Sequence, residues 1–276
     1  MFDRFLLPFL ALCLTPPAVA QSSDDALLDQ LFETSHIERH YEIIRDYAIG
    51  DWLATEANLF PGQGGADWLA AADAANGLDQ IARDFRDGFQ AVDVPPDLMQ
   101  LAIDGYGTEF GQMLLTRGFD MDALMGQTPD LPALFAAAEA AGDPRVSAAD
   151  GFIARMGTVE TYLAFDLAGT RAYYQGLADA GGVSGGAEGI EPLMADYEEA
   201  LMTQVAPQVL PTYREFFFLF AYDFDADQLQ AWETFSATDW SMAYERAFQS
   251  GYRQAYAASL YRQGMAAVEY VGEGGQ

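Results

Sequence analysis

The chain has 276 residues, with 42 acidic and 13 basic side chains and a formal net charge of −29. So acidic a surface repels phosphate backbones, which argues against nucleic acid as a partner. The only cysteine is Cys13, so the chain after it contains no disulfide and no cysteine-based metal site. We interpret the charge first as a well-solvated surface; adaptation to a cationic partner or ligand is the alternative.

Residues 1–20 are predicted to be a cleavable signal peptide. An apolar run follows Arg4 and ends at Leu14, and Ala18-Val19-Ala20 supplies the small residues that signal peptidase requires. The apolar run is too short to span a membrane, and no later run is long enough. We therefore expect a periplasmic or secreted protein that begins at Gln21 and has no transmembrane segment after cleavage.

The first predicted module covers residues 24–125 and is helical, because apolar residues recur at spacings of three and four. We expect a first short helix over 24–33. Ser35-His36-Ile37-Glu38 resembles a capping box that opens the second helix. The later helix starts are predicted at Asp67, Leu78, Pro96 and Thr108, and Gly118 should end the last of them.

A linker is predicted over 126–146, where prolines interrupt the helical pattern. The second module, 147–266, begins with Ser147 as a predicted helix cap. Long helical stretches should follow over 159–180, 190–205 and 209–222, with further helices capped by Asp225 and by Ser236 or Thr238. The glycine-rich end of the chain, 267–276, is predicted to be a flexible tail.

The two modules resemble each other in sequence. Asp93, Asp97, Gln100 and Thr108 recur 130 positions later as Asp223, Asp227, Gln230 and Thr238. These residues fall where helices are predicted to begin and end. We therefore predict an internal repeat and an all-α fold of two related multi-helix modules, packed separately or as one bundle-like body.

One segment of the first module resembles a known family. Pro96-Asp97-Leu98 through Tyr106-Gly107-Thr108-Glu109-Phe110-Gly111 and on to Leu115 is similar to the C-terminal signature of the bacterial domain-of-unknown-function family numbered 2059. Ala26-Leu27-Leu28 is similar to that family's opening helices. In the second module Ser241 replaces the signature glycine. The resemblance implies an exported helical domain and carries over no functional residue.

The only histidines, His36 and His40, lie one helical turn apart and are weak candidates for metal ligands. They do not form the zinc-protease motif, because Ile37 stands where that motif has glutamate. A metal site would need further ligands, which only carboxylates could supply. We therefore expect two histidines on a helix flank, with no metal and no cofactor.

Three other patterns resemble functional motifs or sites. Residues 182–186 match the G-x-S-x-G pattern of the nucleophile elbow. The elbow needs a strand before it, but the preceding sequence is predicted to be helical. The aspartates of 223–227 resemble a calcium loop, but Gln228 and Thr234 replace its glycine and glutamate. The aromatic residues of 213–224 are expected to fill a core, with the lining of an apolar-ligand cavity as the alternative.

No catalytic residue is predicted, so we expect a non-catalytic binding or structural module of the cell envelope. Its partner would be an unknown protein or a small-molecule ligand. Two alternatives remain open: a carboxylate-based envelope hydrolase and a carrier of an apolar ligand. The hydrolase would show a cleft with two carboxylates, one of them with a raised pKa.

Overall fold

The computed structural model describes residues 18–270, and these form helices without any strand. The predicted all-α class is therefore confirmed. The elements in chain order are α1 (Ala18–Thr34), α2 (Ile37–Leu59), α3 (Gly65–Ala75), α4 (Leu78–Gln90), α5 (Pro96–Tyr106), α6 (Glu109–Phe119), α7 (Met121–Gln127), α8 (Leu131–Ala141), α9 (Pro144–Met156), α10 (Thr158–Asp179), η1 (Gly186–Gly189), α11 (Ile190–Ala200), the π-helical turn η2 (Leu201–Val205), α12 (Ala206–Phe220), α13 (Ala226–Ser236) and α14 (Asp239–Ala267).

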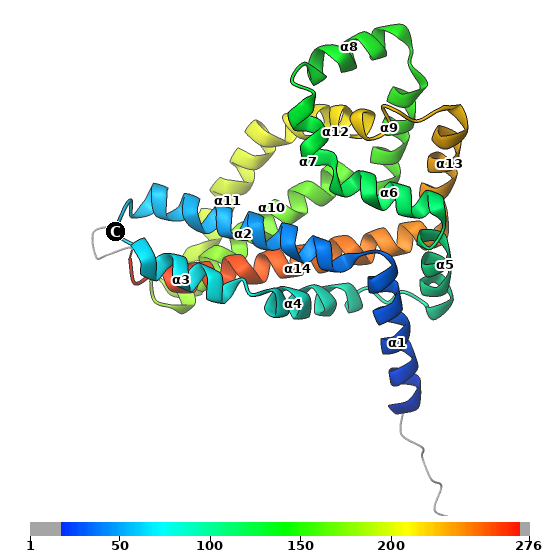
Figure 1. Cartoon of the computed structure of the whole chain (residues 1–276). Helices are drawn as coiled ribbons and strands as arrows, with labels where there is room; N and C mark the ends of the chain where they lie inside the picture. The colour runs from blue at the N-terminus through cyan, green and yellow to red at the C-terminus, as the bar shows by residue number, and fades with distance from the viewer. Residues whose placement is uncertain (1–17, 271–276) are drawn as a thin grey trace, which may run out of the picture.

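The long C-terminal helix α14 is the central element of the fold (Figure 1). It packs most extensively against α10 and α4, and it also contacts α2, α3, α5 and α9. Its residues Tyr244, Ala247 and Ala255 join the largest apolar core, which α1, α2, α4 and α5 complete with Leu31, Ile44, Phe85 and other residues. Helices far apart in sequence are thus held together through α14.

Small residues allow α10 and α14 to approach each other closely. A Cβ atom on Gly176 would lie 2.1 Å from the carbonyl oxygen of Tyr261, and one on Gly264 would lie 2.1 Å from that of Tyr173. No real side chain fits at such distances, so glycine is required at both positions. Nearer the middle of the two helices, a Cβ on Gly169 would lie 2.9 Å from the ring of Tyr256.

A second apolar core lies between α6–α9 and the pair α12 and α13, in the upper part of Figure 1. Phe218 of α12 is fully buried in it and packs edge-on against Phe135 of α8 with ring centroids 5.6 Å apart. Trp232 of α13 stacks on Phe152 of α9. Helix α8 therefore lies inside the range predicted as a linker and contributes to this core.

The helix boundaries of the two halves coincide at one constant offset. Helix α4 ends at Gln90 and α12 at Phe220; α5 covers 96–106 and α13 covers 226–236; α6 begins at Glu109 and α14 at Asp239. Each pair of positions differs by 130 residues. Helix α3, which precedes α4, and helix α11, which precedes η2 and α12, also have the same length of 11 residues.

Several predicted caps are present. Thr108 accepts a hydrogen bond from the Gly111 amide, and Thr238 accepts one from the Ser241 amide at the equivalent place. Asp225 forms a complete capping box. Its side chain accepts a hydrogen bond from the backbone amide of Gln228, and the Gln228 side chain accepts one from the backbone amide of Asp225. Thr238, rather than Ser236, caps α14.

Two predicted caps are wrong. The Ser35 hydroxyl is buried and donates to the Leu31 carbonyl oxygen, so it closes α1 instead of opening α2. His36 takes the cap position of α2 in a left-handed conformation (φ 54°). Ser147 lies inside α9, whose cap is Asp143 because Pro144 already begins the helix.

The expected break between 205 and 209 is also wrong. Helices α11 and α12 are joined through η2 without a loop, because Pro207 lies in the first turn of α12, where its missing amide costs little. Helix α1 begins at Ala18 rather than at Asp24. Residues 1–17 of the predicted signal peptide and 271–276 of the predicted tail lie outside the described range.

Candidate functional site

The two histidines turn to different surroundings. His36 is exposed, and its Nε2 donates to Oε1 of Gln112 on α6 at 2.7 Å. The Gln112 amide is itself held by donation to the carbonyl oxygens of Thr34 and Tyr106. The contact therefore ties the start of α2 to α6.

His40 packs among aromatic rings instead. Its ring centroid lies 4.8 Å from that of Phe119 and 4.6 Å from that of Phe248. Burial, assisted by the neighbouring Arg39 charge, lowers the pKa of His40 to about 4, so the ring is neutral near pH 7. Across residues 18–270, no group of three or more His, Cys, Asp or Glu side chains is arranged to hold a metal ion.

The motif-like segments have structural roles. Asp223 accepts a hydrogen bond from Arg117 at 3.0 Å, and Asp225 caps α13. The glycine-rich stretch 182–186 follows the end of helix α10 at Asp179, so no strand leads into Ser184. Neither segment has the geometry that its motif requires.

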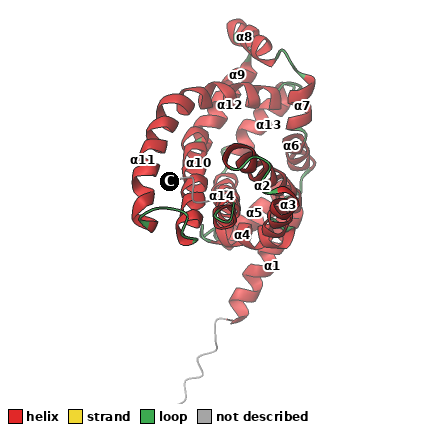
Figure 2. Cartoon of the chain, turned by 90° about the vertical axis from the view of Figure 1, so that its left-hand side faces the viewer, coloured by secondary structure: helices red, strands yellow, loops and turns green. Residues whose placement is uncertain are grey.

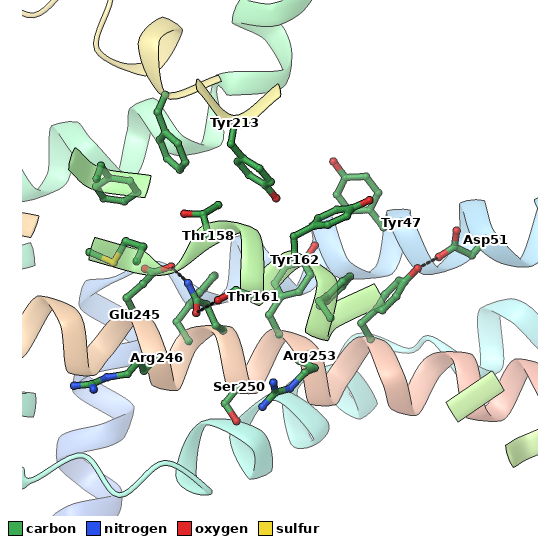
Figure 3. A pocket seen from close by; sticks show the side chains of 18 residues that line it. Tyr47, Asp51, Thr158, Thr161, Tyr162, Tyr213, Glu245, Arg246, Ser250 and Arg253 are labelled. Atoms are coloured by element: carbon green, nitrogen blue, oxygen red, sulfur yellow. Dashed lines mark hydrogen bonds between the residues drawn. The ribbon is translucent and has the colours of Figure 1, made fainter. Parts of the chain in front are cut away.

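A cleft of about 690 Å³ is lined by residues of α2, α9, α10, α12 and α14. Figure 3 shows it from close by, and Figure 2 shows α12 closing the fold above α10 and α14. The lining residues are Tyr47, Asp51, Phe152, Met156, Thr158, Thr161, Tyr162, Phe165, Tyr213, Phe217, Glu245, Arg246, Phe248, Gln249, Ser250, Tyr252, Arg253 and Tyr256. We call this space the aromatic cleft.

The aromatic rings of the cleft contact one another across helix boundaries. Phe165 of α10 stacks on Tyr256 of α14 with centroids 4.5 Å apart. Tyr162 of α10 meets Tyr213 of α12 edge-on at 6.2 Å. Tyr47 of α2 is 53 % exposed, so it marks the side of the cleft that is open to solvent.

The aromatic run of α12 divides between two roles. Phe218 and Phe220 are buried in the second core, as expected for a core segment. Tyr213 and Phe217 line the aromatic cleft. The run therefore contributes both to a core and to the wall of a cleft, while binding of an apolar ligand there stays a prediction.

Two carboxyl groups border the aromatic cleft. Asp51 of α2 accepts a hydrogen bond from the Tyr256 hydroxyl at 2.5 Å (Figure 3). Burial, together with the nearby negative charge of Asp166, raises the pKa of Asp51 in spite of that hydrogen bond. Burial also raises the pKa of Tyr256.

The second carboxyl group is Glu245 of α14. It accepts a hydrogen bond from the Gln249 side chain at 3.0 Å, and Gln249 in turn accepts one from the Thr161 hydroxyl at 3.2 Å. Burial raises the pKa of Glu245, and the hydrogen bond from Gln249 only partly opposes this. The cleft therefore contains two acidic groups in surroundings that disfavour their charge.

A smaller cavity of about 180 Å³ borders the aromatic cleft. Phe152, Met156, Glu245 and Phe248 line both spaces, and His40 lines the smaller one. Of the residues around these two spaces, only His40 and the aromatic run of α12 are indicated by the sequence as candidates for a site, and the part contributed by α14 is not. Its available signal was the stripe of Phe248, Tyr252 and Tyr256 at intervals of four residues along α14.

No protein-family model, curated protein or solved structure matches this chain. The resemblance to the domain-of-unknown-function family numbered 2059 therefore stays a prediction. No helix within 18–270 combines the length and the apolar character needed to cross a membrane.

Proposed function

We propose that this protein is a non-catalytic binding protein that holds a small organic ligand in the aromatic cleft. One observation carries the proposal: half of the eighteen lining residues are aromatic. Ligand sites are typically concave and mostly apolar, with a few polar groups that orient the ligand. The volume of about 690 Å³ lies within the range usual for small-molecule sites.

The position of the cleft supports the same proposal. Its walls come from five helices, and several of its polar side chains are hydrogen-bonded to one another: Tyr256 to Asp51, and Thr161 through Gln249 to Glu245. The rings of Tyr162 and Tyr213 meet at the boundary between α10 and α12. An apolar ligand that fills the space would remove aromatic surface from water, at a gain of roughly 25 cal/mol per Å².

The test uses an uncharged fluorescent dye, N-phenyl-1-naphthylamine, with native mass spectrometry of the purified protein. Phe217→Ala removes a ring from the cleft and should weaken dye binding by at least about tenfold. Phe110→Ala is the matched control, because Phe110 of α6 is also a partly buried phenylalanine of the second core, does not line the cleft, and has its ring contact with Phe235, which does not line it either. Equal loss in both variants, or no binding by the native protein, would refute the proposal.

A carboxylate-based hydrolase is the second candidate. Asp51 and Glu245 border one cleft, but burial raises the pKa of both, whereas this activity pairs one carboxyl group of raised pKa with one that stays ionised. Binding is the better-supported function, because Tyr256 and Gln249 already engage the two carboxyl groups. Turnover of a glycoside or ester panel by the native protein, lost in Glu245→Gln, would establish the hydrolase instead.

The proposed site of action is the cell envelope. Export depends on the predicted signal peptide, whose cleavage sequence Ala18-Val19-Ala20 forms the first residues of α1 in the uncleaved chain. Intact-mass measurement of protein from the periplasmic fraction should show a chain that begins at Gln21. A mass that includes residues 1–20 would contradict this proposal.

An internal duplication is proposed for the helical framework. It is supported by the helix boundaries that recur at an offset of 130 residues and by the equivalent caps at Thr108 and Thr238. The aromatic cleft draws on both halves, since α2 belongs to the first and α10, α12 and α14 belong to the second. Related sequences that contain only one half would be expected to lack a complete cleft.

A further inference from the structure

We propose that the ligand of the aromatic cleft is an organic cation, with a quaternary or protonated ammonium group held against tyrosine faces and opposite the carboxyl groups of Asp51 and Glu245. This inference rests on the proposed function and names its ligand class.

The aromatic residues supply the first argument. Five tyrosines border the cleft, and they come from α2, α10, α12 and α14. The face of an aromatic ring carries partial negative charge and attracts an ammonium group within about 6 Å. Rings from several helices around one space are the usual way in which proteins enclose quaternary ammonium groups. The lining residues are Tyr47, Tyr162, Tyr213, Tyr252 and Tyr256.

The charges around the cleft supply the second argument. Asp51 and Glu245 both border the space. Asp122 of α7 and Asp166 of α10 add negative charge from farther away. Burial is the main cause of the raised pKa values of Tyr47 and Tyr162; Asp122 is the smaller cause for Tyr47, and Asp166 for Tyr162. These acidic groups favour a cation over a neutral or anionic ligand of the same shape. A bound cation would in turn stabilise the charged forms of Asp51 and Glu245, which burial alone disfavours, and the charged carboxyl groups would make the potential in the cleft negative.

The arginines that border the cleft do not cancel this potential. In Figure 3 the guanidinium groups of Arg246 and Arg253 extend from the side of α14 that faces away from Tyr162 and Tyr213. Arg246 also donates to the carbonyl oxygen of Met242 in its own helix, at 3.1 Å. Both side chains are exposed. The groups that face the aromatic rings are thus acidic or uncharged.

The size and the surface charge indicate which cations fit. A volume of about 690 Å³ is far larger than a bare metal ion, and the described residues include no metal-binding cluster. The ligand therefore carries an apolar body that fills the remaining space. A net charge of −29 draws cations toward the protein and raises their local concentration near the opening at Tyr47.

The test compares two probes of nearly the same shape by isothermal titration calorimetry. Benzyltrimethylammonium carries the positive charge, and neopentylbenzene replaces the charged nitrogen by carbon. The cation should bind at least about tenfold more tightly. Glu245→Gln should weaken binding of the cation by roughly fivefold and leave the affinity for neopentylbenzene unchanged, because the substitution removes the charge and keeps the side-chain shape.

Glu233→Gln is the matched control. It removes one negative charge from an exposed position on α13 that does not border the cleft, so the affinity for the cation should stay the same. An equal loss in both variants would mean that general surface attraction, rather than the cleft, holds the cation, and would overturn the inference. Circular dichroism checks that each variant is folded.

The remaining outcomes separate this inference from the proposed function. Equal affinity for the two probes, or binding of the uncharged dye without binding of the cation, would overturn the inference and leave the proposed function in place. Failure of the cation, neopentylbenzene and the dye alike would overturn both. Tighter binding of the cation that depends on Glu245 and not on Glu233 would support both.

Discussion

The buried imidazole of His40 makes the stability of this protein sensitive to acid in a defined way. The ring lies against Phe119 and Phe248, where burial and then the Arg39 charge lower its pKa from 6.5 to about 4. The unfolded chain therefore binds a proton at His40 well before the folded chain does. A group with a lowered folded pKa stabilises the fold above its unfolded pKa, and this stabilisation is lost as the pH falls toward the folded pKa.

The size of the effect follows from the two pKa values. The full shift, from 6.5 to about 4, corresponds to about 3 kcal/mol of unfolding free energy. Between about pH 7.5 and about pH 5 the loss due to His40 should be about 2 kcal/mol. Glu245 and Asp51 act in the opposite direction, because burial raises their pKa values. The contribution of His40 must therefore be isolated by a variant.

The measurement is urea unfolding of the native protein and of His40→Leu across this pH range. Leucine loses the ring contacts at every pH, but it does not titrate, so the free-energy difference between the two proteins should shrink by about 2 kcal/mol toward about pH 5. Nuclear magnetic resonance of the imidazole protons provides a direct check, with His36→Gln used to assign the remaining signal to His40. Parallel pH profiles for the two proteins would refute the reasoning.

Three further predictions concern packing, capping and charge. Gly264→Ala would place a Cβ 2.1 Å from the Tyr173 carbonyl oxygen and should lower the unfolding free energy by about 3 kcal/mol in urea. Gly118→Ala, where nothing lies within 4 Å, should instead raise it by about 0.5 kcal/mol; destabilisation by both would contradict the crossing geometry. Thr238→Ala removes the cap of α14 and should cost about 1 kcal/mol in thermal unfolding, and no change would argue against the cap. The stability associated with the raised pKa of Glu245 is present below pH 4.5 and is lost as the pH rises through the pKa of the folded protein. The unfolding free energy of Glu245→Gln should therefore increase relative to that of the native protein with increasing pH, and a free-energy difference that does not change with pH would contradict this.

Local sequence signals predicted the helices and many of their ends. Thr108, Asp225 and Thr238 could be identified because a cap depends on a side chain and an amide three residues away. Ser35 has the same local pattern, but burial between two helices turns its hydroxyl back to Leu31. That outcome depends on tertiary packing, which the local pattern does not contain.

The aromatic cleft could not be predicted in the same way. Its two carboxyl groups, Asp51 and Glu245, are separated by most of the chain and are brought to one space by the packing of α2 and α14. Among 42 acidic residues, nothing in the sequence distinguishes these two. The aromatic run of α12 did indicate a possible cavity, but only the fold shows that Tyr213 and Phe217 face it.

The glycine crossing of α10 and α14 has a consequence for ligand selection. Both helices line the cleft, and at Gly176 and Gly264 their backbones are already in contact. Rotation of side chains cannot bring these two helices closer together at this crossing, which lies farther along them than their cleft-lining residues 158–165 and 245–256. We therefore expect adjustment to ligands of different width to come mainly from α2, α9 and α12, which line the cleft and take no part in the glycine crossing.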